Sequence, residues 1–344
     1  MISISDISKF LRKHPRLDLF LYIIRYKLKS SQLSKDMLEA EKNPMVVHYR
    51  HNGNLNSDLI LYVIRTDERN IKGGFCWHLR LTLLHMAYAE KMHFVPVVKW
   101  DKRILYNENK PIHGVEDCFL YFFENTFPAD QIDQSDLVVY SKVWDVNPFF
   151  SFPGYYVNDS ELTLLADMIK KYLRFNNYGK AEIGVKAEKI VEGRRVLGVH
   201  IRGTDFKKNY NAHPKMVTLD EYLYNVEQVL NSGNYDFVFL ATDEEKTLDI
   251  FREKVGIKLL YHEVLRSKGG EALHTSTYSL RENHRYNLCR EILMDLFTLG
   301  RCDGLIAGLS NVSIIARALK KSRGEKYMDE IILDKGINRN LRKF

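Results

Sequence analysis

Two polar side chains that can bind a ligand, a histidine and an arginine, stand two residues apart in the sequence. His200 lies inside the apolar run Val196–Ile201, and Arg202 follows directly after that run. Residues i and i+2 of a β-strand face the same side, so both side chains point to one face of the expected strand. A guanidinium group keeps its charge and holds phosphate oxygens through paired hydrogen bonds. A histidine satisfied by the backbone and an arginine paired with Asp205 explain the same residues equally well.

The run Val196–Ile201 itself predicts a strand that is buried on both faces of a parallel sheet. It is short, nearly continuous and rich in β-branched residues. Gly203, which follows Arg202, lets a ligand or the chain itself come close. Ligands of open α/β sheets bind just outside the carboxyl ends of the strands. We therefore expect a binding site where this strand ends.

Two further loops are expected at the same edge of the sheet. Thr242 and Asp243 end a second apolar run, and an N-cap for the next helix is their simpler interpretation. Ser310 and Asn311 follow the apolar run 304–307 and enter a helix, whose free N–H groups and positive dipole end suit a diphosphate. An N-cap explains these two residues as well. The coincidence of three such loops favours a nucleotide site.

The elements that would position these loops alternate between strand and helix, as in a doubly wound, Rossmann-like domain. The expected strands are 196–201, 237–241, 258–261 and 304–307, and the expected helices are 219–230, 244–254, 287–299 and 310–321. Thr218 and Glu221 have the spacing of a capping box at the start of the first of these helices.

The first half of the chain has a strand–helix–strand order that is typical of a parallel sheet. The expected strands are 59–64, 94–98 and 137–140, and the expected helices are 79–92 and 161–175. Pro96 favours an edge strand or a strand end, because proline cannot donate to a sheet ladder. The polar stretch 176–189 is the predicted crossing between two domains.

Length, charge and cysteine content restrict the number of domains, the class of partner and the location that we expect. A chain of 344 residues exceeds one usual core, which favours two domains. The net charge of +7 favours an anionic partner, such as a nucleotide-linked substrate, an anionic membrane surface or nucleic acid. Nucleic acid is disfavoured, because the basic residues are dispersed and no nucleic-acid module is recognisable. Four widely spaced cysteines without a C-x-x-C motif indicate neither a zinc site nor a disulfide framework, and favour a cytoplasmic location.

The N-terminal segment 1–44 has no secretory signal, and its apolar stretch 17–24 is too short to span a bilayer. The residues that flank this stretch are basic: Arg12, Lys13, Arg16, Arg25, Lys27 and Lys29. Two interpretations stay open: a basic amphipathic helix lying on a membrane surface, and a helix packed on the domain with a solvated basic face. Peripheral membrane contact is therefore an alternative to a freely cytoplasmic protein.

Three motifs of the second half resemble those of a known family. They are, in chain order, 199–205 (VHIRGTD) followed by His213, Pro214 and Tyr222; 239–243 (FLATD); and 295–303 (DLFTLGRCD) with 308–311 (GLSN). Their order and spacing resemble the three motifs of the α1,6-fucosyltransferases, the nodulation-factor fucosyltransferases and, more distantly, the protein O-fucosyltransferases. The match covers residues 190 to 320. In the first half only Gly73-Gly74 and the stretch 121–124 are similar to the family.

The resemblance implies a two-domain GT-B glycosyltransferase that uses GDP-fucose as its donor and needs no separate cofactor. The roles implied by motif position are Arg202 at the β-phosphate, His200 and Asp295 at the guanine, Ser310 and Asn311 at the diphosphate, and Asp243 along the donor site. The sequence has no D-x-D motif, so we expect no metal, and Arg202 takes the part of the cation. The leaving diphosphate gains charge during the reaction, which a fixed arginine and helix-end amides would stabilise.

This chain departs from the family pattern at two places. Gly203 stands where the first motif usually carries a second arginine. An inverting transfer needs a base for the acceptor hydroxyl, and the glutamate proposed for that role in the α1,6 enzymes has no equivalent in 206–211. Asp205 and His213 are the substitute candidates. With Arg202, Asp205 completes the predicted catalytic pair.

We predict a basic helical segment at 1–44, an N-terminal α/β domain for the acceptor at 45–189, a C-terminal Rossmann-like domain for the nucleotide sugar at 190–325, and a tail at 326–344. The predicted activity is inverting transfer of L-fucose to a glycan acceptor in the synthesis of a surface polysaccharide or glycoconjugate. One alternative is a GT-B enzyme that uses another nucleotide sugar. The other is a non-catalytic relative that binds a glycan or a nucleotide.

Overall fold

The chain divides into two compact units. The computed structural model describes residues 46–50, 52–65, 73–141, 154–203, 212–269, 271, 273 and 281–338. The first unit comprises Met1–Lys72, Leu81–Arg103 and Asn125–Phe152, and the second comprises Gly73–Arg80, Ile104–Glu124 and Pro153–Phe344. This division differs from the predicted domain boundary, because residues 153–189 belong to the second unit. The predicted N-terminal segment 1–44 lies outside the described residues.

The first unit is built on a four-stranded sheet of order β1-β4-β2-β3. Its strands are β1 (Val46–Arg50), β2 (Leu55–Ile64), β3 (Val95–Val98) and β4 (Ser135–Ser141). β2 pairs in parallel with both β3 and β4, whereas β1 pairs antiparallel with β4. β3 is an edge strand, as Pro96 predicted. The sheet is therefore mixed, with a parallel centre and one antiparallel edge.

Helix α4 (Phe75–Lys91) belongs to the first unit from Leu81 onward. It starts four residues before the predicted 79, because Phe75 and Cys76 are buried and extend the apolar face. The Tyr62 hydroxyl of β2 lies 2.9 Å from Nδ1 of His85, and Trp100 Nε1 donates to Thr82 Oγ1 at 3.0 Å. A short 3-10 helix, η1 (Ala129–Gln134), precedes β4.

The second unit contains a five-stranded parallel sheet of order β7-β6-β5-β8-β9. The strands are β5 (Val196–Ile201), β6 (Phe237–Thr242), β7 (Leu259–Leu260), β8 (Gly304–Gly308) and β9 (Glu330–Leu333). Numbered along the chain, this is the 3-2-1-4-5 order of a Rossmann-type half, with the reversal between β5 and β8. The expected α/β fold class and the buried central strand are confirmed, since all six residues of β5 are buried.

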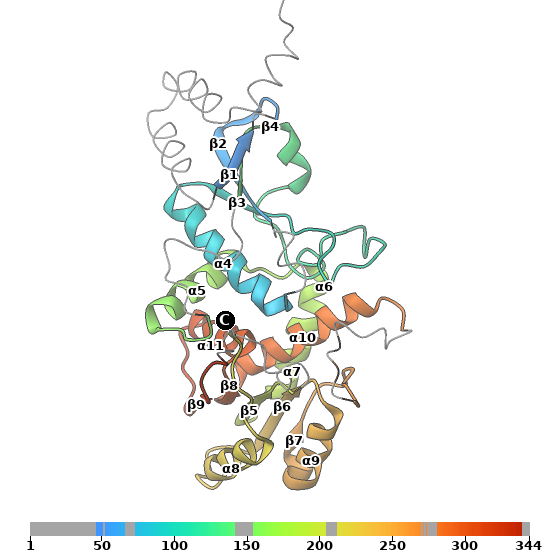
Figure 1. Cartoon of the computed structure of the whole chain (residues 1–344), viewed down its shortest axis with the longest axis vertical. Helices are drawn as coiled ribbons and strands as arrows, with labels where there is room; N and C mark the ends of the chain where they lie inside the picture. Colours follow the sequence, from blue (N-terminus) through green and yellow to red (C-terminus); the bar gives the residue numbers. More distant parts are fainter. Residues whose placement is uncertain are drawn as a thin grey trace, which may run out of the picture. The chain divides into compact units, whose positions relative to one another are not determined.

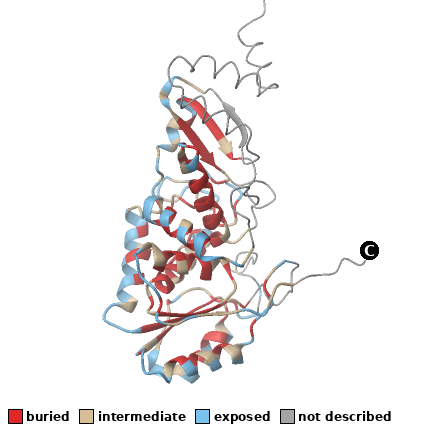
Figure 2. Cartoon of the chain, turned by 90° about the vertical axis from the view of Figure 1, so that its left-hand side faces the viewer, coloured by how far each residue is buried: buried red, intermediate tan, exposed pale blue. Residues whose placement is uncertain are grey.

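Helices cover both faces of this sheet (Figure 1). On one face lie α8 (Leu219–Leu230) and α9 (Glu245–Val255), and on the other lie α10 (His284–Arg301) and α11 (Asn311–Ser322). Figure 2 shows the buried residues gathered in the strands and on the inner sides of these helices. The core between β5, β6 and α8 includes Leu197, Val199 and Val226. Thr218 and Glu221 form the predicted capping box, with both of its hydrogen bonds.

Two stretches of the second unit differ from the sequence-based expectation. The predicted crossing 176–189 is helical, comprising α6 (Asn177–Gly179), the π-helix η2 (Lys180–Gly184) and α7 (Val185–Val191). Asn176 caps α6, and buried Ile183 and Ala187 attach this polar stretch to the core. Within the predicted tail, β9 adds a strand to the sheet. Its four residues are short enough to escape recognition, and β8 provides the partner.

The remaining elements of the second unit are α5 (Asp159–Tyr172) and the 3-10 turn η4 (Gly256–Lys258). Asn158 caps α5 by accepting a hydrogen bond from the Glu161 N–H at 2.9 Å. None of the helices within the described ranges combines the length and the apolar character that crossing a membrane requires.

Candidate nucleotide-binding site

The loop after β5 and the loop after β8 meet at His200. This residue is the fifth of β5 and is only 8% exposed, and its Nδ1 lies 3.4 Å from Oγ of Ser310. Burial, together with the smaller effect of the nearby Arg202 charge, lowers the pKa of His200 to about 3. The imidazole is therefore neutral at physiological pH. In that state one ring nitrogen donates a hydrogen bond and the other accepts one.

Arg202 lies at the end of β5, half-buried, with its charge close to several buried groups. Burial raises the pKa of the Cys76 thiol to about 12, and the Arg202 charge opposes that rise. Burial likewise raises the pKa of Tyr106, again against the Arg202 charge. The guanidinium of Arg202 is thus the positive centre of a group that contains His200, Cys76 and Tyr106.

The loops after β5 and β6 are tied together by Asp243. Its Oδ1 accepts a hydrogen bond from the Gly203 N–H at 2.9 Å. The N-cap of α9 is Glu244, which makes no side-chain capping hydrogen bond, so the capping interpretation of Thr242 and Asp243 is wrong. A Cβ atom at Gly203 would overlap the Glu244 carboxylate. Position 203 therefore has no room for a second arginine while Glu244 keeps this conformation.

Ser310 and Asn311 begin α11 at the end of β8. Ser310 caps the helix, and its Oγ accepts from the Ser313 N–H at 3.0 Å within a capping box. The simpler interpretation of Ser310 is therefore correct, although the same side chain also faces His200. Asn311 uses its Oδ1 to accept from Nη1 of Arg80 at 3.2 Å. Both residues thus lie at the predicted helix start, already hydrogen-bonded to protein.

Arg80, which the sequence did not single out, is fully buried beneath the start of α11. It donates to Glu161 Oε1 at 2.6 Å and to the Gly154 carbonyl at 2.6 Å, besides its contact with Asn311. One guanidinium thus joins α4, α5 and α11. No sequence signal pointed to this role, because an arginine in a helix is usually taken for a solvated residue.

Asp295, on α10, has a carboxyl group whose Oδ1 is enclosed and finds no hydrogen-bond partner among the described residues. Burial raises its pKa to about 8; Arg266 opposes the rise, and Glu291 and Asp243 add to it. The carboxyl is therefore mostly protonated at neutral pH. These interactions place Asp295 near Asp243, so the structure brings the second and third motifs together.

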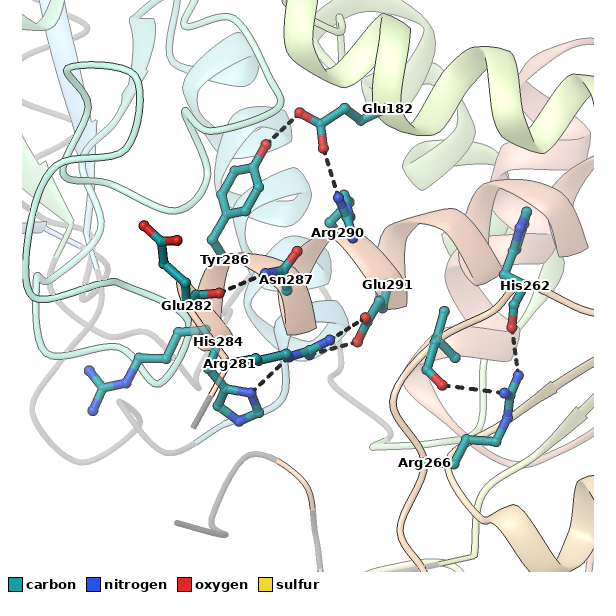
Figure 3. Close-up of polar contacts among 12 residues, drawn as sticks. Glu182, His262, Arg266, Arg281, Glu282, His284, Tyr286, Asn287, Arg290 and Glu291 are labelled. Carbon is teal, nitrogen blue, oxygen red and sulfur yellow. Dashed lines mark hydrogen bonds and ion pairs between the residues drawn. The ribbon is translucent and has the colours of Figure 1, made fainter. Parts of the chain in front are cut away.

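Arg266, in the segment after β7, is a second residue that the sequence analysis missed. Its Nη2 donates to the His262 carbonyl at 2.9 Å and its Nη1 to the Val264 carbonyl at 3.4 Å (Figure 3). The same view shows Arg281, which precedes α10, paired with Glu291 of α10 at 2.6 Å. The available signal was positional, because Arg266 follows the carboxyl end of a parallel strand.

The predicted acceptor base stays a prediction. Asp205 lies outside the described residues. His213 is half-buried, with its ring centroid 6.0 Å from that of Tyr155. Across the described ranges, no three His, Cys, Asp or Glu residues gather closely enough to hold a metal ion. All four cysteines are buried and free.

The arrangement provides two chemically different surfaces at one sheet edge. Around the β5–β8 reversal lie a fixed cation, Arg202, a neutral imidazole and the start of a helix, a combination that suits phosphate oxygens. Around the ends of β6 and β7 lie the carboxyl groups of Asp243 and Asp295 with Arg266, which suit a polar ring with several donors and acceptors.

Neither a family model nor a curated protein sequence matches the chain. Among solved structures, NodZ α1,6-fucosyltransferase soaked with GDP-fucose has a TM-score of 0.44 and 17% identity, over 75% of this chain and 92% of that chain. NodZ from Bradyrhizobium has a TM-score of 0.44 and 16% identity, over 75% and 91%. POFUT1 in complex with GDP has a TM-score of 0.42 and 13% identity, over 80% and 98%. At these values the likeness establishes neither family nor activity.

Proposed function

We propose that this chain is a glycosyltransferase that transfers L-fucose from GDP-fucose to a glycan acceptor, with inversion at the anomeric carbon. The observation that carries the proposal is the meeting of the loops after β5, β6 and β8 around Arg202, through the Gly203–Asp243 and His200–Ser310 contacts. The resemblance of the three motifs supplies the donor. A surface polysaccharide or glycoconjugate is the acceptor class that we propose.

In the proposed reaction the acceptor hydroxyl oxygen forms a bond to C1 of fucose while the bond from C1 to the β-phosphate oxygen breaks. The electron pair of the broken bond leaves with GDP, so negative charge grows on the diphosphate. Arg202 and the N–H groups at the start of α11 would stabilise that charge. A basic group takes the proton of the acceptor, and Asp205 and His213 are the proposed candidates.

A melting experiment tests the proposed donor. A ligand that binds only the native state raises the melting temperature, and at equal concentration a tighter ligand raises it more. GDP should therefore raise it more than UDP, ADP or CMP at equal concentration. Equal shifts from all four nucleotides would contradict the guanine assignment. Release of GDP from GDP-fucose, but not from GDP-mannose, would then separate the proposed donor from another guanine nucleotide sugar.

The second candidate function is a non-catalytic protein that binds a nucleotide or a glycan. Gly203 in place of the usual arginine favours it, because one source of charge stabilisation is missing. A protein that is stabilised by GDP but neither transfers nor hydrolyses any nucleotide sugar would have this second function.

A further inference from the structure

Residues 262–267, which follow β7, form hydrogen bonds to the candidate site at both ends. At one end His262 Nε2 lies 2.8 Å from Thr298 Oγ1 on α10, one turn from Asp295. At the other end the Ser267 N–H donates to the Asp243 carbonyl at 2.8 Å, and the Glu245 N–H donates to the Ser267 carbonyl at 3.0 Å. Residues 262–267 therefore run between the loop after β6 and the face of α10 that carries Asp295.

Arg266 is held inside this segment and is only 6% exposed. Its Nε is enclosed and has no hydrogen-bond partner, and none of the ion pairs within the described ranges involves it. A buried charge without a counter-ion is strongly unfavourable unless something else satisfies it. Its two printed acceptors are backbone carbonyls on its own segment, which fix the guanidinium without neutralising it.

Asp295 is the complementary group on the opposite side. Its enclosed Oδ1 also lacks a partner, and the Arg266 charge reaches it strongly enough to shift its titration. No ion pair within the described ranges joins these two groups. An arginine N–H group and a carboxyl oxygen, each without a hydrogen-bond partner there, thus come from two elements and lie within electrostatic reach of each other.

The hydrogen-bond donors and acceptors of guanine match the unpaired groups of both Arg266 and Asp295. Guanine O6 and N7 accept the paired hydrogen bonds of an arginine, while its N1–H and N2–H groups donate to a carboxylate. Adenine has the opposite pattern at the corresponding edge, an amino donor beside a ring-nitrogen acceptor. Adenine therefore presents an amino donor to Arg266 where guanine presents the O6 acceptor, and the arginine loses that hydrogen bond.

We infer that Arg266 selects the guanine base by donating hydrogen bonds to its O6 edge, beside Asp295, which the motif resemblance already assigns to the guanine. This inference rests on the proposed function, since it takes the bound nucleotide to be GDP. It assigns to the segment after β7 a role in specificity, and it leaves phosphate binding to Arg202. The GDP-to-ADP preference is the quantity that Arg266 controls.

The test is the dissociation constant of GDP, IDP and ADP, measured by calorimetry for the wild type, Arg266→Lys and a control. Inosine keeps O6 and N1–H and lacks only the 2-amino group. Arg252→Lys is the matched control, because Arg252 contacts the same Tyr261 ring, at 5.0 Å against 5.5 Å for Arg266, from an exposed position on α9. Arg266→Lys should weaken GDP and IDP about 10- to 100-fold and ADP hardly at all. The control should change none of the three.

The measured dissociation constants distinguish an error about the role of Arg266 from an error about GDP binding itself. Equal weakening of all three nucleotides, or an unchanged GDP-to-ADP ratio, would overturn the role of Arg266 while GDP binding by the wild type stands. Failure of the wild type to bind GDP would instead remove the proposed function. If Arg266→Lys does not fold, 6-thio-GDP tests the same contact on the wild type. Sulfur at position 6 is a weak acceptor, so binding as tight as that of GDP would also overturn the inference.

Discussion

The candidate site derives its chemistry from burial acting on individual side chains. Burial keeps His200 neutral and holds a proton on Asp295, whereas Arg202, close to His200, keeps its positive charge. The neutral imidazole, the protonated carboxyl and the permanent cation each interact differently with a ligand. Each side chain can be tested separately by a substitution that keeps its approximate shape and changes its charge, protonation or hydrogen-bonding geometry.

Arg202→Lys keeps the positive charge and loses the planar, two-pronged geometry. If Arg202 stabilises charge that grows as GDP leaves, its contribution is larger in the transition state than in the ground state. We expect turnover to fall roughly 10²–10³-fold, as for other lost donors to developing charge, with a much smaller loss of GDP affinity. Steady-state kinetics and calorimetry measure the two quantities. A folded variant with normal turnover would remove Arg202 from the mechanism.

The affinity for GDP should depend on pH through Asp295. The carboxyl has a pKa of about 8 in the free protein, where Arg266 lowers it and Glu291 and Asp243 raise it. It must lose its proton to accept the guanine N–H groups. Binding should therefore weaken by about tenfold for each pH unit below that value. Calorimetry in buffers of different ionisation enthalpy should show proton release, which Asp295→Asn should abolish. A flat affinity profile in the wild type would contradict this role.

Asp295→Asn should also stabilise the free protein. The folded pKa of about 8 lies above 3.8, the ordinary pKa of an aspartic acid side chain, so between these values the unfolded chain gives up a proton that the folded chain keeps. The wild type therefore loses stability as pH rises through this window, by up to about 1.4 kcal/mol per pH unit. The melting temperature of the variant should exceed that of the wild type more at high pH than at low pH. Asp249→Asn, at an exposed position on α9, is the control and should show no such trend.

At the scale of elements, the start of α11 is positioned from below by Arg80. Its ion pair with Glu161 is buried, at 2.6 Å, and its third contact reaches Asn311. Three helices that are distant in sequence thus converge on one guanidinium. The helix start that would meet the diphosphate is fixed by a residue that does not itself belong to the site.

Removing one partner of a buried ion pair leaves the other charge uncompensated. Arg80→Met should therefore reduce the free energy of unfolding by about 3–5 kcal/mol. Combining it with Glu161→Leu should restore most of that loss, because neither charge then remains. Chemical denaturation measures both variants. Equal destabilisation by the single and double substitutions would show that packing, rather than charge, holds these helices together.

Local signals predicted the elements, whereas contacts between distant residues could not be predicted. The apolar run of β5 and the Thr218–Glu221 capping box have short-range patterns, and the structure confirms both. Arg80 and Arg266 have no such pattern, because their partners come from other elements. β9 was missed for the same reason, since only its pairing with β8 distinguishes it from a tail. The loops that carry His200, Asp243 and Ser310 were predicted to meet because each follows the carboxyl end of a strand, and the structure brings them together. Their roles toward a nucleotide stay predictions.

At the scale of the whole molecule, the proposed activity depends on charge supplied by the protein. The sequence has no D-x-D motif, and no candidate metal cluster occurs within the described ranges. We propose that Arg202 performs the neutralisation that a divalent cation performs elsewhere. The net charge of +7 has the sign that attracts an anionic nucleotide sugar.

Transfer or hydrolysis of GDP-fucose should therefore continue in excess EDTA. Initial rates with and without the chelator should agree within about twofold, since no step of the proposed mechanism uses a metal. The control is a D-x-D glycosyltransferase assayed under the same conditions. Loss of activity that Mn²⁺ or Mg²⁺ restores would show that a cation takes part and that Arg202 does not replace it.

The Glu244 carboxylate occupies the space that a side chain at position 203 would fill. A substitution at position 203 therefore depends on the residue at position 244, both in evolution and in engineering. An arginine introduced at position 203 alone would have to displace a carboxylate that is held beside the Thr247 hydroxyl at 3.3 Å. That carboxylate is the far end of a flexible side chain, so a larger residue at position 203 is accommodated only when Glu244 turns away. A variant that restores the two-arginine form of the first motif therefore tests position 203 and the conformation of Glu244 together.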